Sequence, residues 1–346
     1  MISNERLKTY IIILNYNGWT DTIECLESVF RSDYLNFQVV VVDNNSPNNS
    51  LEYIKAWSEG KINVWTDPKN QLRHLSFPPV QKPISSVYYT KKEAEKGGNR
   101  DLENKFNNPL ILIQTGHNGG FAFGNNVGIS YALAKDDFEY IWLLNNDTVI
   151  SSNSISISVE FFKKHPEVDL IGPKILDTNN EDWQWSFLRR VSFWSSLLTQ
   201  SPIRWLVYKT SYYRSFFATN NIPQKVYSIP GSSMMFRKIE LLDENTFLFW
   251  EEFIIAERMR SSGLITYFVP DVIIWHKLGK SISKTGAKKS IENLKSGNYF
   301  FDNYLYLSNL ERCILLLLRV LSYMLKMLFD KSYRKHLGEF LRVVFS

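Results

Sequence analysis

The sequence has 346 residues, 44% of them hydrophobic and only 22% charged, so it can bury a large core and is not disordered throughout. Its two cysteines, Cys25 and Cys313, lie far apart with no Cys/His cluster, which excludes a disulfide framework and a structural zinc site and favours a cytoplasmic setting. The net charge of +5 is uneven: residues 277–346 hold 13 Lys and Arg against 5 Asp and Glu, and residues 1–276 hold 27 against 30.

Short apolar runs alternate with helical patterns over the first part of the chain. Continuous apolar runs are typical of strands buried on both faces of a parallel sheet. They predict strands at Tyr10–Leu14, Phe37–Val42, Lys61–Trp65, Leu110–Gln114 and Glu139–Leu144. Apolar residues at helical spacing predict helices over Trp19–Phe30 and around Leu51–Trp57. The first run is too short for a signal-peptide core, and the alternation predicts a doubly wound, mostly parallel α/β sheet with helices on both faces.

The rest of the chain is less regular. Residues 66–109 contain five prolines and no sustained period, which indicates an irregular insertion. Beyond Asp147 we expect two helices and two strands, and an aromatic-rich segment over Trp183–Phe217. These elements are helices near Ser154–Lys164 and Trp250–Ser262, and strands at Val226–Ile229 and Ile265–Val269. We therefore expect one domain over residues 1–276 and a basic, helical extension over residues 277–346.

Polar residues follow four of the predicted strands directly. Ligands of open parallel sheets bind beyond the carboxyl ends of the strands, so four such ends on one edge favour a binding site. Each of these loops on its own is equally well explained by tight turns and helix caps. We expect the ligand contacts to come from Asn15, Asp43, Asn118, Gly120, Asn125 and Asn146. Neither G-x-G-x-x-G after the first strand nor a Walker A motif is present, which argues against a dehydrogenase and a P-loop enzyme.

Six segments in their order along the chain carry a family resemblance. They are VVVVDNNS (39–46), NGGFAFGNNVGI (118–129), YIWLLNNDT (140–148), PGSSMMFRK (230–238), FLFWEEFIIAERMRSSG (247–263) and WHKLGKS (275–281). Together they resemble family 2 glycosyltransferases of the rhamnosyltransferase-like kind. The resemblance implies a GT-A fold, a nucleotide-diphosphate sugar donor, a divalent metal (Mg²⁺ or Mn²⁺) and inverting transfer to a hydroxyl acceptor.

The resemblance also assigns metal-site and donor-site residues. Asp147 lies in the segment that corresponds to the family's DxD-type motif and would bind the metal, whose charge neutralises the diphosphate. Asn145 replaces the first acid of that motif, so we expect low metal affinity without the donor. Asp43 corresponds to the residue that accepts a hydrogen bond from the donor base, with an Asx turn as the alternative. His276 corresponds to a histidine that reaches the metal or the diphosphate, and a purely structural histidine is the alternative.

Direct displacement at the anomeric carbon needs a base that takes the proton of the acceptor hydroxyl. The family has a Glu-Asp pair at the start of a helix, and Glu251 and Glu252 occupy that place here. Glu252 is therefore the candidate base, and an acid on the helix surface is the alternative. We expect the helix N-terminus to favour its ionised form. Ile254 replaces a further acid usual in the family, which leaves the acceptor open.

The basic tail has two notable parts. Four lysines within Leu278–Lys289 indicate a lid that closes on the diphosphate or an ordinary solvated loop. In the leucine-rich helix predicted over Asn309–Phe329, Arg312, Arg319 and Lys326 recur every seven residues. Charges in this helix argue against a membrane span, whereas a basic stripe beside an apolar face is typical of a helix on an anionic membrane surface. Docking on the catalytic domain or formation of a homodimer is the alternative.

The sequence thus predicts a cytoplasmic, peripheral enzyme at the inner face of the cell membrane. We expect it to transfer a sugar, from dTDP-rhamnose or a UDP-sugar, to a lipid-linked glycan or another saccharide acceptor, and we expect no nucleic-acid partner. A sugar nucleotidyltransferase is the competing enzyme, but its G-x-G-x-R-L-type loop is absent after the first strand. A non-catalytic sugar-binding subunit is the third interpretation, because Asn145 and Ile254 replace acids.

Overall fold

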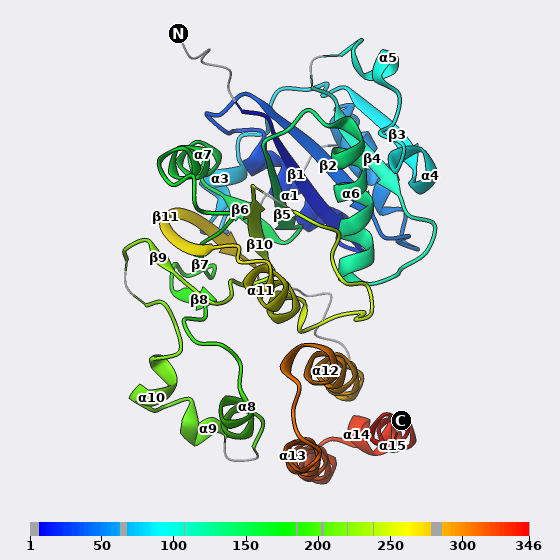
Figure 1. Cartoon of the computed structure of the whole chain (residues 1–346). Helices are drawn as coiled ribbons and strands as arrows, with labels where there is room; N and C mark the ends of the chain where they lie inside the picture. The colour runs from blue at the N-terminus through cyan, green and yellow to red at the C-terminus, as the bar shows by residue number, and fades with distance from the viewer. Residues whose placement is uncertain are drawn as a thin grey trace.

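The structure is a computed structural model, and it describes residues 7–62, 68–106, 108–184, 186–201, 204–219, 221–237, 239–277 and 286–345. These residues form a mixed α/β domain around a sheet of eleven strands (Figure 1). The strands are β1 Thr9–Asn15, β2 Phe37–Asp43, β3 Ser86–Thr90, β4 Leu110–Gln114, β5 Tyr140–Asn145, β6 Thr148–Ile150, β7 Leu170–Leu176, β8 Asp182–Gln184, β9 Gln224–Lys225, β10 Ser233–Phe236 and β11 Thr266–His276.

The sheet has two parts that differ in strand direction. Its order is β3-β4-β2-β1-β5-β10-β7-β11-β6, with β8 beside β7 and β9 beside β11. From β3 to β5 every pair is parallel, as the continuous apolar runs predict. Beyond β5 the sheet is mostly antiparallel, because β10 runs against both β5 and β7, and β6 runs against β11. The first part has the doubly wound order, and the second part brings distant segments to the same edge.

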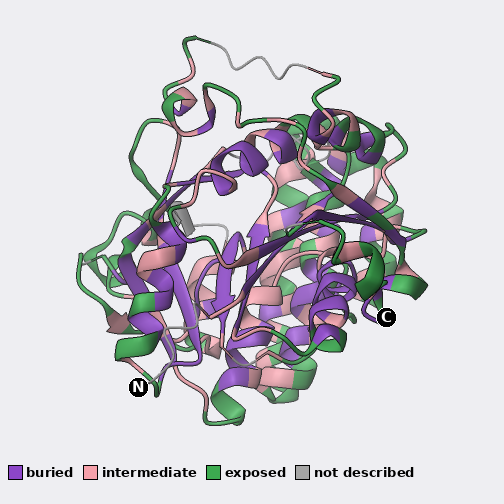
Figure 2. Ribbon diagram, turned by 90° about the horizontal axis from the view of Figure 1, so that it is seen from above, coloured by how far each residue is buried: buried purple, intermediate pink, exposed green. Residues whose placement is uncertain are grey.

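Helices cover both faces of the sheet. The larger ones are α1 Trp19–Val29, α2 Ser50–Ser58, α6 Phe121–Lys135, α7 Ser154–Lys164 and α11 Glu251–Ser261. Shorter ones are α3 Arg73–Ser76, α4 Lys91–Ala94, α5 Arg100–Glu103, α8 Phe193–Gln200, α9 Arg204–Val207 and α10 Ser211–Arg214. Ile11 and Ile13 of β1 pack into the core under α1, α2 and α7, whereas Tyr10 and Ile12 pack into the core under α6 and α11. Figure 2 shows the buried residues gathered in the central strands between these helices.

Three expected elements differ from the structure or lie outside its described residues. The insertion over residues 66–109 contains a regular element, the edge strand β3, which pairs in parallel with β4. The predicted strand at Val226–Ile229 is wrong: β9 covers Gln224–Lys225 only, and Ser228 forms an isolated bridge with Phe187. Most of the strand expected at Lys61–Trp65 lies outside the described residues, which omit 63–67.

Strand β11 runs seven residues past the predicted end at Val269. Its pairing with β7 shifts register between Val269 and Ile273, at Pro270. Proline cannot donate to the ladder and is accommodated in sheets at such irregularities. The strand therefore continues to His276 and delivers that residue to the edge at which β6 begins.

The C-terminal extension is helical, as predicted. It consists of α12 Gly286–Phe300, a π-helical turn at Phe301–Leu305, α13 Asn309–Phe329, α14 Lys331–Lys335 and α15 Leu337–Val344. Figure 1 shows these helices on the side of the sheet domain on which α11 lies. Ile291 and Leu294 of α12 share a small core with Tyr323 of α13 and Phe340 of α15. Residues 278–285, which include most of the expected lid, lie outside the described residues.

Of the basic residues of α13, Arg319 and Lys326 face the protein and Arg312 is exposed, so the three do not form the expected membrane-facing stripe. Arg319 donates to the side chains of Gln200 in α8 and of Asn298 in α12. Lys326 donates to Ser290 Oγ at 3.4 Å, and Arg312 forms an ion pair with Asp302 at 2.7 Å. The outward face of α13 is apolar instead, with exposed Leu310, Leu317, Leu321, Met324, Leu325, Leu328 and Phe329. The docking alternative is therefore correct for the basic face.

Candidate functional site

The carboxyl ends of β1, β2, β4 and β5 lie at one edge of the sheet, because these strands are parallel. In the register, Asn15 lies opposite Asp43, and Asp43 lies opposite Gln114. Asn145 at the end of β5 lies opposite Leu14 on the other side of β1. The polar residues that the sequence places after four strands are therefore neighbours along one edge, which is where open α/β sheets bind ligands.

Asp43 links the ends of β1, β2 and β4 by hydrogen bonds. It is 1% exposed, and its carboxylate accepts four hydrogen bonds. Asn15 Nδ2 and Ser46 Oγ each donate to Oδ1 at 2.6 Å, and Ser46 N and Gln114 Nε2 each donate to Oδ2 at 3.0 Å. Four bonds fill the lone-pair positions of a carboxylate, so a donor base would bond Asp43 by replacing one of them. Ser46 and Gln114 were not predicted, although both stand at a strand end.

Asn146 is turned toward the start of α1. Its Nδ2 lies 3.0 Å from Thr22 Oγ1, 3.2 Å from Gly18 O and 3.4 Å from Asn15 Oδ1. Thr22 Oγ1 in turn donates to Asn15 Oδ1 at 2.8 Å. Asn15 and Asn146 thus fix the β1 and β5 loops against each other, and their role is to shape the edge.

Asn118 and Gly120 form the loop that precedes α6. Asn44 Nδ2 donates to Asn118 Oδ1 at 2.9 Å and to Gly120 O at 3.0 Å, which joins this loop to the end of β2. Gly120 has φ +93°, and a Cβ there would lie 2.2 Å from Phe247 O. Only glycine fits this position, because both the dihedral angle and the contact exclude a side chain. The loop is thereby pressed against the segment that leads into α11, and Phe121 N donates to Phe247 O at 2.9 Å.

Asn125 and Asn126 differ in role. Asn125 Nδ2 donates to Phe121 O of its own helix at 3.0 Å. Asn126 was not predicted, yet it exchanges bonds with the backbone of Leu242 and donates to Glu244 Oε1 at 2.6 Å. The adjacent asparagines of the sequence gave no means of telling which one faces the neighbouring loop.

Asp147 and His276 lie together although 129 residues separate them. His276 Nε2 and Asp147 Oδ1 are 3.0 Å apart, and the pairing of β11 with β6 places His276 opposite Thr148. Burial opposes ionisation of Asp147, but the hydrogen bond and charge of His276 and the charge of Lys277 outweigh it and lower the pKa of Asp147. The pair predicted from two distant segments is therefore formed, and its carboxylate is ionised at neutral pH.

Lys277 holds this pair to the rest of the domain. Its backbone N donates to Asp147 O at 2.9 Å, and its Nζ lies 2.8 Å from Asp21 Oδ1 and from Glu24 Oε2 in α1. Burial lowers the pKa of Lys277, but the charges of Glu24 and Asp21 outweigh it and raise that pKa above its usual value. Lys277 was not predicted, because its partners are distant in the sequence.

Asp147 and His276 offer one carboxylate oxygen and one imidazole nitrogen, a donor set that suits Mn²⁺ or Mg²⁺ with further oxygen ligands. Among the described residues no group of three or more His, Cys, Asp and Glu is placed to hold a metal ion. Asn145, at the first position of the motif, adds no carboxylate. The residues fit a cation that takes its remaining ligands from phosphate oxygens and water.

Glu251 and Glu252 begin α11 after two residues in the left-handed region, Phe249 at φ +73° and Trp250 at φ +70°. Such backbone strain in non-glycine residues is concentrated at functional sites. Burial, and after it the charge of Glu252, raises the pKa of Glu251 to about 8. Burial also raises the pKa of Glu252. The expected effect of the helix N-terminus is thus outweighed for both acids, and Glu251 is mostly protonated at neutral pH.

Two contacts hold the first turn of α11 beside the end of β5. Asn145 N donates to Ser232 O at 2.9 Å, which fixes the turn before β10 to the end of β5. In that turn Gly231 lies against Glu251, since a Cβ on Gly231 would be 3.7 Å from Glu251 Cγ. The acidic pair and the residue before Asn146 and Asp147 therefore meet at the same edge of the sheet.

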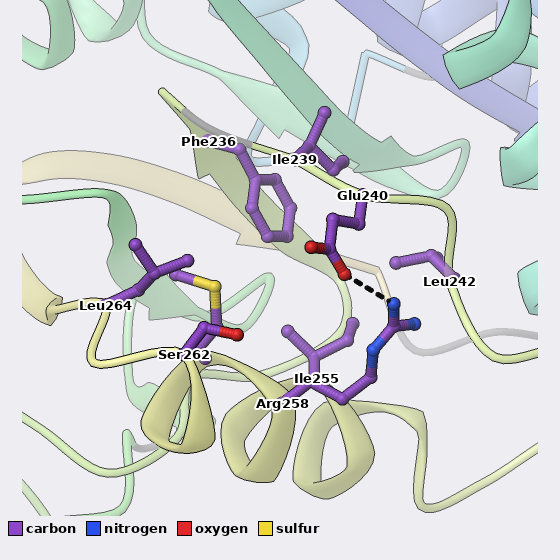
Figure 3. A pocket seen from close by; sticks show the side chains of 9 residues that line it. Phe236, Ile239, Glu240, Leu242, Ile255, Arg258, Ser262 and Leu264 are labelled. Carbon is purple, nitrogen blue, oxygen red and sulfur yellow. Dashed lines mark hydrogen bonds and ion pairs between the residues drawn. The ribbon is translucent and has the colours of Figure 1, made fainter.

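A cavity of about 260 Å³ opens beside the second half of α11 (Figure 3). Phe236, Ile255 and Leu264 give it an apolar wall, and Arg258 Nη2 and Glu240 Oε2 close one side with an ion pair of 2.9 Å. None of the candidate site residues lines this cavity, so it is a gap in the packing of α11 and not part of the site.

Comparison with known families identifies the chain. The profile of the family described as glycosyltransferase like family 2 matches residues 82–291, more than half of the chain, and that of glycosyl transferase family 2 matches residues 10–75. The chain belongs to glycosyltransferase family 2. The family predicted from the six sequence segments is confirmed, whereas its rhamnosyltransferase-like kind stays a prediction.

Solved structures of glycosyltransferases are similar to this family 2 chain, and GalNAc-T7 shares its fold. GalNAc-T7 with UDP, GalNAc and Mn²⁺ has a TM-score of 0.51 and 14% identity, over 87% of this chain and 49% of that chain. The mannosyltransferase PcManGT from Pyrobaculum calidifontis, with GDP-Man and Mn²⁺, has a TM-score of 0.49 and 12% identity, over 99% and 86%. TarS from S. aureus with UDP-GlcNAc has a TM-score of 0.49 and 16% identity, over 98% of this chain and 82% of that chain. The GT-A fold is confirmed, and this chain spans about half the length of GalNAc-T7.

Two further comparisons concern relatives and membrane spans. No curated protein matches this family 2 chain. Within the described residues, none of the helices combines the length and the apolar character that crossing a membrane requires.

Proposed function

We propose that the chain is a metal-dependent, inverting glycosyltransferase that moves a sugar from a nucleotide-diphosphate donor to a hydroxyl of a lipid-linked glycan or polysaccharide precursor. The observation that carries this proposal is the shared edge. It holds an ionised Asp147 beside His276 and, through Ser232 and Gly231, a carboxyl pair with raised pKa values. Family membership supports the reaction class, and the UDP and Mn²⁺ of the GalNAc-T7 structure support the donor class and the metal.

In this mechanism Glu252 accepts the proton of the acceptor hydroxyl. The hydroxyl oxygen bonds to the anomeric carbon from the face opposite the nucleotide, and the bond from that carbon to the diphosphate oxygen breaks with its electron pair on the diphosphate. Asp147 and His276 would hold the cation, which when bound neutralises the charge of the departing diphosphate. Protonated Glu251 keeps a second negative charge away from Glu252, and a raised pKa makes Glu252 a stronger base than a solvent-exposed glutamate.

The donor proposal is a pyrimidine nucleotide sugar, dTDP-rhamnose or a UDP-sugar, with Asp43 and Gln114 at the base. Thermal-shift screening of nucleotide sugars with and without Mn²⁺ or Mg²⁺ tests it, followed by determination of the anomeric configuration of the product. We expect stabilisation that needs both metal and donor, and a product of inverted configuration. A retained configuration contradicts the direct displacement, and stabilisation by the donor that is equally large with and without metal contradicts the metal site.

Replacing Asp147 with Asn tests the metal ligand. The change removes the only carboxylate of the Asp147–His276 pair, so we expect metal-assisted donor affinity to fall about tenfold or more, whereas the weak affinity without metal stays the same. Calorimetric titration with a UDP-sugar, with Mn²⁺ and with EDTA, measures both affinities. Unchanged affinity in the presence of Mn²⁺ would mean that Asp147 does not bind the metal.

A non-catalytic sugar-binding subunit is the second candidate, because the site has a single carboxylate at the metal position and Asn145 in place of an acid. Donor hydrolysis by the purified protein separates the two. Slow release of nucleoside diphosphate that depends on Glu252 and Asp147 supports the enzyme. Metal-dependent donor binding with no release of nucleoside diphosphate supports the subunit.

We further propose a peripheral position on an anionic membrane, in contact with the apolar face of α13. Leu317, Leu321 and Leu328 are 61%, 48% and 65% exposed and lie along one side of this helix. Interfacial helices insert such a face into the boundary between headgroups and acyl chains. This replaces the basic stripe, of which Arg319 and Lys326 face the protein, as the proposed membrane contact.

A further inference from the structure

A second cavity lies between the C-terminal extension and the segment that contains α8. It has a volume of about 440 Å³ and is lined by residues of α8, α12, α13, α14 and α15 and by Tyr208. Three basic side chains line it, Lys289 of α12 and Arg319 and Lys326 of α13, together with hydroxyl and amide groups that include Ser290, Ser322 and Asn293. None of the fourteen described residues that line the cavity is acidic. Its lining has the composition of an anion site.

The three cations of this cavity lack acidic partners within the part of the chain that the structure describes. Among those residues, Lys289, Arg319 and Lys326 form no ion pair within 4.0 Å, whereas Arg312 of the same extension pairs with Asp302 and Lys295 pairs with Glu292. Asp330 lies beside the cavity: Ser332 N donates to its Oδ1, and its Oδ2 lies 3.5 Å from the position of a Cβ on the lining residue Gly286. Among the described residues, ion pairs are thus formed elsewhere in the extension, and the three cations of the lining form none.

Arg319 is the most deeply placed of the three. Its guanidinium donates to two neutral side chains, Gln200 and Asn298, and lies over the ring of Phe301 with 4.8 Å between Cζ and the ring centroid. Its Nη2 is buried against Gly297 of α12, outside the cavity lining, and has no hydrogen-bond partner among the described residues. Burial lowers the pKa of Arg319 to about 10, which the charge of Asp302 only partly opposes. A buried cation without an anion is unfavourable, and an anion in the cavity would offset that cost.

The cavity is joined to the proposed active site by the loop that precedes α11. Lys289 Nζ lies 5.6 Å from the ring centroid of Phe249, and Ser296 Oγ of α12 donates to Leu248 O at 2.7 Å. The same loop continues directly into Glu251 and Glu252. Lys289 therefore joins the lining of the cavity to the segment that leads into the candidate base.

The exposed apolar stripe lies on the side of α13 that faces away from the cavity. Leu317, Leu321 and Leu328 alternate along the helix with the cavity residues Arg319 and Lys326. A helix with side chains is about 10–12 Å across. A membrane that receives the stripe would therefore lie within about that distance of the cavity, which favours a lipid-borne anion over a free one.

We propose that the cavity between α12 and α13 binds the phosphate or diphosphate group of the acceptor, through Lys289, Arg319 and Lys326. This inference rests on the proposed function in taking the acceptor to be lipid-linked. In this proposal the basic residues of the cavity bind the acceptor, and the diphosphate of the donor binds at Asp147.

Calorimetric titrations in EDTA test the cavity with three probes: inorganic pyrophosphate, geranyl diphosphate and geraniol. We expect both diphosphates to bind and geraniol to show no binding at the same concentrations. Arg319→Gln and Lys326→Gln should each weaken diphosphate binding about tenfold, because each removes a charge from a partly desolvated site. Arg312→Gln is the matched control on the same helix, since its partner Asp302 lies outside the cavity lining, and its affinity should equal that of the wild type.

Titrations of further variants locate the bound diphosphate. If Arg319→Gln lowers the thermal unfolding temperature, its diphosphate affinity no longer tests the site. The diphosphate affinities of Lys289→Gln and Lys326→Gln test it instead, because these side chains lie nearer the surface. Unchanged affinity in both variants overturns the proposal.

Asp147→Asn should leave metal-free diphosphate binding intact, and a loss there would assign the anion to the donor site and overturn the proposal. Binding of pyrophosphate with exclusion of geranyl diphosphate overturns the assignment to a lipid-linked acceptor. Absence of sugar transfer with intact diphosphate binding refutes the proposed function and leaves the cavity site in place.

Discussion

Glu251 and Glu252 are adjacent and chemically identical, but their surroundings separate their charges. The pKa of Glu251 rises to about 8 through burial and through the charge of Glu252, so Glu251 is mostly protonated at neutral pH. Burial also raises the pKa of Glu252, whose carboxylate is the proposed base. Two carboxyl groups with one proton between them are a recurring means of assigning one of them the role of base.

Substitution by glutamine distinguishes the two acids. Glu252→Gln removes the base and keeps its shape, so transfer should fall by about 10² or more while donor affinity stays the same. Glu251→Gln is the matched control, because a neutral amide resembles a protonated carboxyl group, and it should retain most activity at pH 7. Steady-state kinetics of both variants check this. Near-normal turnover in Glu252→Gln, or an equal loss in both, contradicts the assignment of the base.

The same pair makes stability depend on pH. The folded-state pKa of Glu251 is raised above its unfolded value, so its contribution to the free energy of unfolding is fully present below about pH 4.5 and is lost as the pH rises to about 8. Glu251→Gln removes this dependence. Urea denaturation at pH 5 and pH 8 should therefore show a smaller loss of stability in the variant than in the wild type. An equal loss in both proteins would mean that Glu251 does not ionise in this range.

Among the elements, the loop before α6 depends on one glycine for its contact with the loop before α11. Gly120→Ala introduces a Cβ where Phe247 O lies 2.2 Å away, in addition to strain at φ +93°, so the two loops must separate. Gly116→Ala is the matched control, because its φ of +86° brings similar strain but nothing lies within 4 Å of its Cβ. Thermal unfolding and transfer rates should both fall further in Gly120→Ala. Equal effects would show that the contact with Phe247 is unimportant.

Helix α13 allows a test of the membrane proposal. Replacing Leu317, Leu321 and Leu328 with Ser removes apolar surface from the exposed stripe, and flotation with vesicles of phosphatidylcholine and phosphatidylglycerol should show loss of binding. Arg312→Gln should float like the wild type. If the serine variant still floats, the stripe is not the membrane contact. If sedimentation shows that the variant is a monomer and the wild type a dimer, the stripe joins two copies of the chain.

The elements that could be predicted are those whose local sequence pattern is compatible with only one kind of secondary structure and burial. Runs such as Val39–Val42 are apolar on both faces, and in the structure they pack into both cores. Strand β3 was missed because it is a half-buried edge strand among prolines, where Tyr88 is 49% exposed and Tyr89 is 4% exposed. The orientation of α13 was missed because basic residues at every seventh position define one face of the helix but do not determine what that face contacts. Burial of a cation such as Arg319 is rare, so the solvent-facing interpretation was the natural one.

On the scale of the whole molecule, the site combines segments from most of the chain. The sequence indicated which residues gather at the edge, because strand ends and family motifs mark Asp43, Asp147 and Glu252. It did not indicate that Asn15 and Asn146 bond to each other's loops, because an asparagine beside a strand end binds a ligand or a neighbour with equal ease. The partners of Lys277 and Arg319 depend on contacts between distant segments, which no local pattern encodes.

The separation of 129 positions between Asp147 and His276 has a consequence for biosynthesis. Domains generally begin to fold from the N-terminus while synthesis continues, and strands β1 to β5 need no later segment in order to pair with one another. The metal pair, by contrast, cannot form until β11 has left the ribosome and paired with β6 and β7. A chain whose translation stops before His276 would thus contain the parallel half of the sheet and the donor-side loops, but not the pair. The nascent protein acquires its complete site only after His276 has been synthesised.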